Sequence, residues 1–155
     1  MGFPAENFMT VFLDIDGVLN KESDWRIPFT LNPECVKEFA SFVQKLDRPR
    51  IILTSTWRAG ISVKGNNSPQ YDKLVETLYE YRLVISGATP LTSNKTRDEE
   101  IDYYARRNGI SDYIAIDDDP GLFKGGKNVP LYVTDYRTGF TKEDIKKALK
   151  MIKRR

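Results

Sequence analysis

The 155-residue chain has no histidine and only one cysteine. The absence of histidine excludes Ser-His-Asp and Cys-His catalysis, histidine-ligated zinc and phosphoryl relays through histidine. A single cysteine cannot form an internal disulfide, and Cys35 lies in the apolar-patterned start of an expected helix. We therefore interpret Cys35 as a packing residue, and we expect an intracellular, cytoplasmic protein.

Long hydrophobic runs are absent as well. No stretch could span a bilayer and the N-terminus lacks a signal-peptide pattern, so we expect no membrane contact. The length suits one domain over residues 1–155, and 40% hydrophobic and 30% charged residues are ordinary for a globular protein. The net charge of +2 indicates no particular partner. The basic residues of 146–155 suit a solvated helix end, with a nucleic-acid contact as the alternative.

Short apolar runs alternate with segments of helical periodicity. Strands are expected at residues 9–15, 50–54, 83–86, 113–116 and 129–134, and helices begin near Pro33, Pro69, Arg97 and Thr141. This alternation predicts an α/β fold, a three-layer Rossmann-like parallel sheet of about five strands with helices on both faces. Pro130 places the last strand at an edge of the sheet. The polar and aromatic residues 20–31, here called the flap, form a loop.

Two aspartates one residue apart follow the first apolar run. Gly17 comes directly after Asp14-Ile15-Asp16 and can end the strand in a sharp turn. Both carboxylates then lie at the carboxyl end of a buried strand, where open α/β sheets bind ligands. Carboxylates this close repel each other and need a cation, a shared proton or strong hydrogen-bond donors. Mg²⁺ with oxygen ligands fits best, and the alternative is a solvated acidic turn.

Three other polar segments are expected at the same edge of the sheet. Thr54 and Ser55 follow the second strand, Asp117 and Asp118 follow the fourth, and a cation lies at the start of the third helix. Together they supply carboxylates for Mg²⁺, a hydroxyl group, a positive charge and a helix N-terminus. These groups are what a protein needs to hold and transfer a phosphoryl group.

The segments 13–19, 51–54, Arg97 and 116–118 resemble the four motifs of the haloacid dehalogenase superfamily, in the right order and over nearly the whole chain. The run Leu53-Thr54-Ser55-Thr56-Trp57-Arg58 looks most like small bacterial and phage domains of this superfamily. Some of those domains are fused to RNA-repair proteins, and the phosphatase domain of phage polynucleotide kinase is a more distant relative.

The resemblance implies a role for each acid. Asp14 would be the nucleophile that forms an aspartyl-phosphate. Asp16 would be the general acid toward the leaving oxygen and then the base for the hydrolytic water. Asp14, the backbone carbonyl of Asp16, and Asp117 or Asp118 would bind Mg²⁺.

The resemblance also implies phosphate-binding groups. Thr54 would hold a phosphoryl oxygen, with Ser55 beside it at the substrate. The third motif is usually lysine in the superfamily, so Lys95 and Arg97 are both candidates, and the register favours Arg97. Arg58 would contact a substrate phosphate or orient another group.

The spacing between the motifs leaves no room for a cap domain, and an open site suits a large phosphorylated substrate such as a nucleic-acid end. Trp25 and Phe29 in the flap could stack on a base, although packing against the sheet is the favoured interpretation. The alternatives are a metabolite or nucleotide phosphatase capped by oligomerisation, and a catalytically silent phosphate-binding module. A phosphorelay receiver is excluded, because Thr54 and Ser86 end the middle strands where its acceptor aspartate would be.

Overall fold

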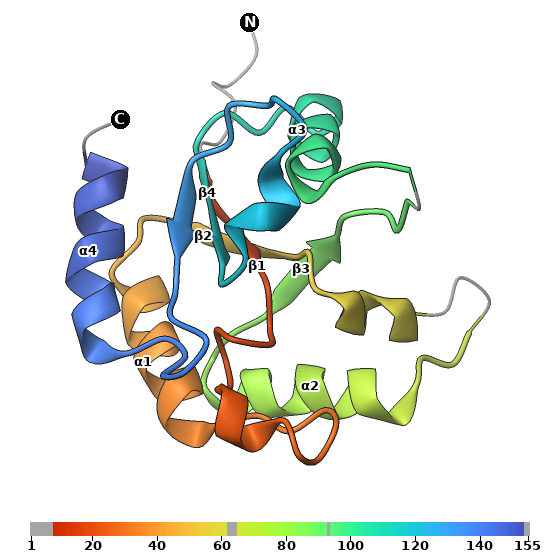
Figure 1. The fold of residues 1–155 in the computed structure, drawn as a ribbon, viewed down its shortest axis with the longest axis vertical. Helices are drawn as coiled ribbons and strands as arrows, with labels where there is room; N and C mark the ends of the chain where they lie inside the picture. The colour runs from red at the N-terminus through yellow and green to blue at the C-terminus, as the bar shows by residue number, and fades with distance from the viewer. Residues whose placement is uncertain (1–7, 62–64, 93, 154–155) are drawn as a thin grey trace, which may run out of the picture.

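The computed structural model describes residues 8–61, 65–92 and 94–153 (Figure 1). Its strands are β1 (Met9–Leu13), β2 (Pro49–Leu53), β3 (Ile85–Ala88), β4 (Tyr113–Asp117) and β5 (Leu131–Val133). Its α-helices are α1 (Pro33–Gln44), α2 (Pro69–Glu80), α3 (Arg97–Arg107) and α4 (Lys142–Lys153). Three short 3₁₀ helices are η1 (Glu22–Asp24), η2 (Thr56–Gly60) and η3 (Pro120–Phe123).

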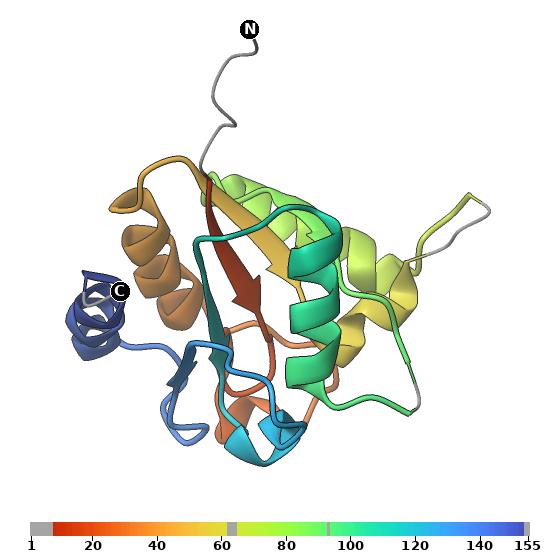
Figure 2. The ribbon, with the colours of Figure 1, turned by 90° about the horizontal axis from the view of Figure 1, so that it is seen from above.

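The five strands form one parallel sheet in the order β3-β2-β1-β4-β5. Alternate residues of each strand face opposite sides. Val11 and Leu13 pack in one core cluster with α1, α2 and α4, whereas Phe12 packs on the other side with Ile101 and Ala105 of α3. Figure 2 shows α3 on one side of the strands and α1 with α4 on the other. The predicted three-layer α/β fold is therefore confirmed.

The helices begin at the residues that the sequence indicates. Asn32 caps α1 by accepting hydrogen bonds from the backbone N–H groups of Glu34 and Cys35 at 3.0 and 3.3 Å. Glu99 accepts from the backbone N–H of Thr96 at 2.9 Å and so closes a capping box on α3. Cys35 is buried, and burial raises the pKa of its thiol to about 11. This agrees with a packing role for Cys35.

The third and fifth strands differ from their predicted bounds. β3 starts at Ile85 and continues through Gly87, which pairs with Ile52 instead of ending the strand. A Cβ on Gly87 would lie 2.7 Å from the Tyr104 hydroxyl, so this glycine makes room for α3. β5 starts two residues later than expected, after Pro130, and lies at an edge as predicted.

The chain order creates a switch point between β1 and β4. The chain passes from β1 to β2 and β3 in one direction, and then returns to β4 on the opposite side of β1. A crevice at the carboxyl ends of two such strands is the usual ligand site of an open α/β sheet. The backbone N–H of Asp14 donates to the carbonyl of Ile116 at 3.1 Å, which holds the two strand ends together. In the described ranges, no helix is long and apolar enough to cross a bilayer.

Candidate active site

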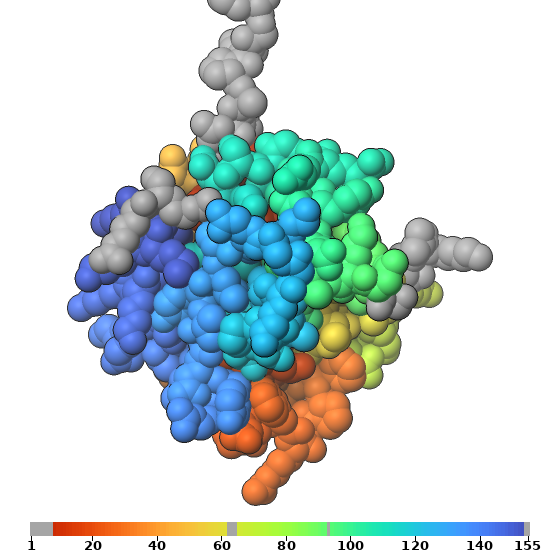
Figure 3. Space-filling model, turned by 45° about the horizontal axis from the view of Figure 1, so that its top comes forward, coloured from red at the N-terminus to blue at the C-terminus, as the bar shows by residue number. Residues whose placement is uncertain are grey.

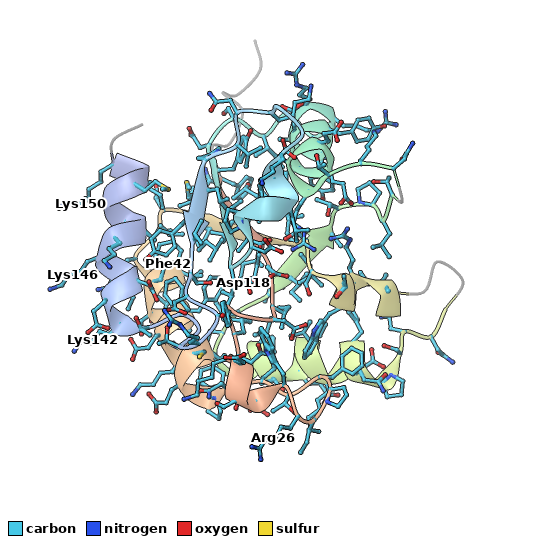
Figure 4. All side chains as sticks on the ribbon, in the orientation of Figure 1. Arg26, Phe42, Asp118, Lys142, Lys146 and Lys150 are labelled. Carbon is cyan, nitrogen blue, oxygen red and sulfur yellow. The ribbon has the colours of Figure 1, made fainter. Side chains whose placement is uncertain are left out.

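A cluster of three carboxylates lies at the switch point. One oxygen each from Asp14, Asp117 and Asp118 lies within 4.8 Å of the others. Asp14 and Asp117 are buried and Asp118 is half-buried, close to the centre of the view in Figure 4. Asp14 leaves β1, whereas Asp117 ends β4, so adjacent strands bring together residues about a hundred positions apart.

Burial makes Asp14 and Asp118 hold their protons more tightly. It is the main reason that the pKa of Asp14 lies well above its ordinary value, and the charge of Asp117 raises the pKa further. Burial likewise raises the pKa of Asp118 to about 6. A cation bound among the three groups would reverse both shifts by stabilising the charged forms.

The cluster fits a hard divalent cation. Its donors are all carboxylate oxygens, the ligands that Mg²⁺ prefers. Metal–oxygen distances of about 2.1 Å put two ligand oxygens at most about 4.2 Å apart in an octahedral site. The three oxygens, all within 4.8 Å of one another, are close to that spacing.

The structure distinguishes the two candidates for the cation of the third motif, Arg97 and Lys95. Arg97 is the first residue of α3, and its Nη1 lies 2.7 Å from Asp117 Oδ2 and 3.4 Å from Asp14 Oδ1. Lys95 precedes the helix and is exposed, with its Nζ 4.5 Å from the centre of the Tyr103 ring. Only Arg97 of these two residues contacts the acid cluster in the structure.

Asp16 faces a different group of residues. Its Oδ1 accepts a hydrogen bond from Asn20 Nδ2 at 2.9 Å, and its Oδ2 accepts from Trp57 Nε1 at 3.1 Å. Asn20 is buried, and its Nδ2 also donates to the Thr30 carbonyl at 2.8 Å. Its Oδ1 accepts from the Gly17 N–H and from Trp25 Nε1, both at 2.9 Å. The carboxylate of Asp16 is thereby held in one orientation at the base of the flap.

Gly17 allows the close approach of the two strand ends. Its φ of +85° is in the left-handed region, and a Cβ there would lie 2.3 Å from Asp118 Oδ2. Its carbonyl accepts a hydrogen bond from the Thr134 hydroxyl at 2.7 Å. A larger residue at position 17 would displace Asp118 from the cluster.

Thr54 and Ser55 follow β2 and are both buried. The backbone N–H of Thr54 donates to the Leu13 carbonyl at 2.9 Å, which places Thr54 directly beside the end of β1. The Ser55 hydroxyl accepts from the Trp57 N–H at 3.2 Å and caps η2. Thr54 therefore lies next to Asp14 along the sheet edge, while the Ser55 side chain is engaged in a local turn.

Arg58 is buried and forms an ion pair with Glu100 of α3, with 2.8 Å between Nη2 and Oε2. Burial lowers the pKa of Arg58 and raises the pKa of Glu100. Glu100 follows Arg97 by three residues, so the pair lies beside the first turn of α3. The structure thus connects Arg58 to the helix that carries Arg97, and not to the acid cluster.

The flap differs from the favoured sequence interpretation. Trp25 is 41% and Phe29 46% exposed, so neither ring is buried against the sheet. The Phe29 ring meets the Trp57 ring edge-on at 5.1 Å, and the Trp25 ring stacks on Tyr136 at 6.1 Å. The packing prediction for these two rings was wrong. Figure 3 shows the flap (orange) beside the segment that follows β4 (cyan) on one face.

The basic side chains of α4 lie elsewhere. Figure 4 shows Lys142, Lys146 and Lys150 on the outer side of α4, pointing away from Asp118. They follow one another at four-residue spacing on an exposed helix face. This is the solvated arrangement that the sequence favoured.

Sequence reasoning missed three residues that organise the site. Asn20 and Trp57 hold Asp16, and Glu100 pairs with Arg58. Asn20 follows Asp16 by four residues in a loop, where a side-chain amide often bonds nearby backbone. No local pattern marks Trp57 or Glu100, because each finds its partner about 40 positions away along the chain.

The fold is that of a haloacid dehalogenase (HAD) domain. Residues 10–145 match the model of the HAD domain in Swiss Army Knife RNA repair proteins, and the chain belongs to that family. No curated protein gives a significant match to the sequence.

Two solved structures resemble this fold. D,D-heptose 1.7-bisphosphate phosphatase from B. bronchiseptica, complexed with magnesium and phosphate, is similar with a TM-score of 0.59 and 14% identity, over 94% of this chain and 99% of that chain. A chain of the Pnkp1/Rnl/Hen1 RNA repair complex gives a TM-score of 0.48 and 13% identity, over 86% of this chain and 44% of that one. The first similarity shows a shared fold.

Proposed function

We propose that the protein is a Mg²⁺-dependent phosphatase that acts through an aspartyl-phosphate on Asp14. The observation that carries this proposal is the position of Asp14, which lies within one carboxylate cluster with Asp117 and Asp118 and 3.4 Å from Arg97. Mg²⁺ bound there would neutralise both the cluster and an incoming phosphoryl group. Membership of the HAD family supports the same chemistry.

Each site residue has a defined role in the two steps of the proposed reaction. In the first step, a carboxylate oxygen of Asp14 attacks phosphorus, the bond to the leaving oxygen breaks, and Asp16 gives that oxygen its proton. In the second step, Asp16 takes a proton from water, the water oxygen attacks phosphorus, and inorganic phosphate leaves Asp14. Arg97 offsets the negative charge on the phosphoryl oxygens in both steps. Thr54 lies beside Asp14 and offers a hydroxyl group to one of these oxygens.

The proposed substrate is large, with a phosphorylated nucleic-acid end as the leading candidate. Between β1 and β2 the described chain forms the flap and α1, and we propose that this single domain leaves the site open, without a cap domain. The family model describes a domain of RNA repair proteins, which favours an RNA end. A metabolite phosphatase whose site is closed by a second copy of the chain is the alternative.

Hydrolysis of a generic aryl phosphate tests the chemistry. We expect turnover with Mg²⁺ and none after chelation, and full activity in the chelated protein would contradict the proposal. Beryllium fluoride with Mg²⁺ mimics the aspartyl-phosphate, so it should raise the melting temperature. At 100 times its dissociation constant it would add about 2.7 kcal/mol to the free energy of unfolding. An unchanged melting curve would favour a silent phosphate-binding module.

A panel of substrates then tests the substrate class. It compares 3′- and 5′-phosphorylated oligonucleotides with the matching mononucleotides and with sugar phosphates. We expect a higher kcat/KM for one of the oligonucleotides, because contacts away from phosphorus can be used in the transition state. A preference for a small sugar phosphate would favour the metabolite phosphatase.

A further inference from the structure

A hollow of about 570 Å³ lies between the flap and η2. It is lined by Asp16, by the rings of Trp25, Phe29 and Trp57, and by smaller residues of the flap and of η2, among them Thr56. Pockets of about 300–1,000 Å³ hold small ligands in proteins. The hollow is therefore large enough for a nucleoside.

The aromatic walls of this hollow are held in place by other rings. Tyr136 supports Trp25 in a stacked pair with an interplanar angle of 26°, and Trp57 supports Phe29 edge-on at 71°. Phe29 also has a φ of +59°, a backbone conformation that costs energy for any residue with a side chain. The fold thus presents two large rings that remain nearly half exposed, at 41% and 46%.

The hollow lies on the leaving-group side of the proposed reaction. Asp16 delivers its proton to the leaving oxygen, so the group attached to that oxygen must lie next to Asp16. In the proposed reaction the acid cluster and Arg97 would hold the opposite side of the phosphoryl group. A leaving group bonded to an aromatic heterocycle would place that ring among Trp25, Phe29 and Trp57.

We propose that this hollow binds the base of the terminal nucleotide whose oxygen leaves, by stacking on Trp25 and Phe29. This inference rests on the proposed phosphatase function. It identifies the terminal base as the part of the substrate that the protein recognises. The hollow recognises a base chiefly by its face, because most of its polar side chains already have partners. The Nδ2 and the Oδ1 of Asn20 already make two hydrogen bonds each, and the Thr30 hydroxyl donates to the Ile27 carbonyl. All four bases should therefore be accepted.

A comparison of two oligonucleotides tests this proposal. They carry the same terminal phosphate, on a normal nucleotide in one and on an abasic sugar in the other. Base–aromatic stacking is worth about 1–3 kcal/mol, so the normal end should have a kcat/KM about 5–150-fold higher. Trp25→Ala should bring this ratio close to one. Tyr79→Ala, which removes an exposed ring on α2 outside the hollow, should leave the ratio unchanged.

Tryptophan fluorescence gives a second readout that needs no turnover. The chain has two tryptophans, and both line the hollow. Titration of the Asp14→Asn protein with a phosphorylated oligonucleotide should quench this fluorescence, and the abasic oligonucleotide should quench it far less at the same concentration. Quenching of equal size by both would overturn the proposal.

The failures of the two proposals can be told apart. If the protein hydrolyses both oligonucleotides with equal kcat/KM, the phosphatase function stands and the base-binding hollow is wrong. If it hydrolyses no phosphate ester, the phosphatase function fails, and fluorescence quenching by the normal oligonucleotide alone would still support base binding.

Discussion

The two sides of the active site are built in opposite ways. On one side, Asp14, Asp117 and Asp118 with Arg97 form a buried, highly charged group at the ends of two central strands. On the other side, the flap presents half-exposed aromatic rings around Asp16, and only a few hydrogen bonds connect it to the rest of the domain. The first side has the features of a site for phosphate and a metal ion, and the second those of a site for an organic group.

The difference shows which functional groups strand ends can hold and which a loop can hold. Like charges brought close together raise the free energy of a protein, so they need rigid neighbours that prevent the charges from separating. Parallel strands supply that rigidity, since backbone hydrogen bonds flank Asp14 and Asp117 on both sides. Rings that stack on a ligand need not be positioned as accurately as paired charges. A loop held by aromatic contacts can therefore present them.

Removal of the two proposed catalytic acids should give the largest effects. Asp14→Asn should abolish turnover, because an amide does not attack phosphorus and no other nucleophile is in place. Asp16→Asn should lower kcat by about 10²–10⁴-fold on an alkyl phosphate. The loss should be smaller on an aryl phosphate, whose leaving oxygen needs less help from an acid. Steady-state kinetics on both esters measures this difference, and turnover by Asp14→Asn would contradict the assignment of the nucleophile.

Substitutions of the two neighbouring cations, Arg97 and Lys95, should differ sharply in their effect on kcat. Arg97→Ala should lower kcat by about 10²–10³-fold, the usual loss for one group that stabilises developing charge. Lys95→Ala is the matched control, and its kcat should stay within about twofold because Lys95 contacts Tyr103 instead of the acids. Lys95→Ala should keep the melting temperature within a few degrees, whereas Arg97→Ala should lower it in metal-free protein, because it leaves the buried carboxylates without their cation. A large loss in Lys95→Ala alone would reverse the assignment.

The acid cluster should make stability depend on pH and Mg²⁺ together. In metal-free protein the folded-state pKa values of Asp14 and Asp118 are raised, the latter to about 6. The contribution of Asp118 to stability is therefore full below about pH 4 and is lost as the pH rises through about 6, and the contribution of Asp14 changes in the same direction. Bound Mg²⁺ should restore it, so the gain in melting temperature should be larger near pH 7.5 than near pH 5. Melting curves with Mg²⁺ or a chelator test this, and an equal gain at both pH values would argue against binding at the cluster.

The smallest effect is expected on the flap side. Trp57→Phe keeps an aromatic ring against Phe29 but removes the N–H that donates to Asp16 at 3.1 Å. A hydrogen bond is worth about 0.5–1.5 kcal/mol, so kcat should fall about 2–10-fold with little change in KM. Rapid kinetics on the alkyl phosphate can measure this. A rise in KM with unchanged kcat would mean that Trp57 serves binding and does not orient Asp16.

Much of the fold was predictable because its signals are local. Asn32, Ser68 and Thr96 each begin a helix through contacts within three residues, and such contacts are visible in the sequence. The acids that follow β1 and β4 were predictable as one group, because parallel strands bring their carboxyl ends to one edge of the sheet. The same reasoning misplaced the end of β3, since Gly87 also suits close packing against Tyr104.

The sequence by itself thus determined the α/β class, the helix starts and the acids at the sheet edge, because short-range spacing and strand ends encode them. Only the tertiary structure decided which cation meets the acids, that Trp57 holds Asp16, and that Arg58 pairs with Glu100. It also decided that Trp25 and Phe29 face a hollow beside Asp16. These pairings join residues whose separation along the chain carries no periodic signal. They form only when packing and strand order bring distant side chains within about 3–6 Å of each other.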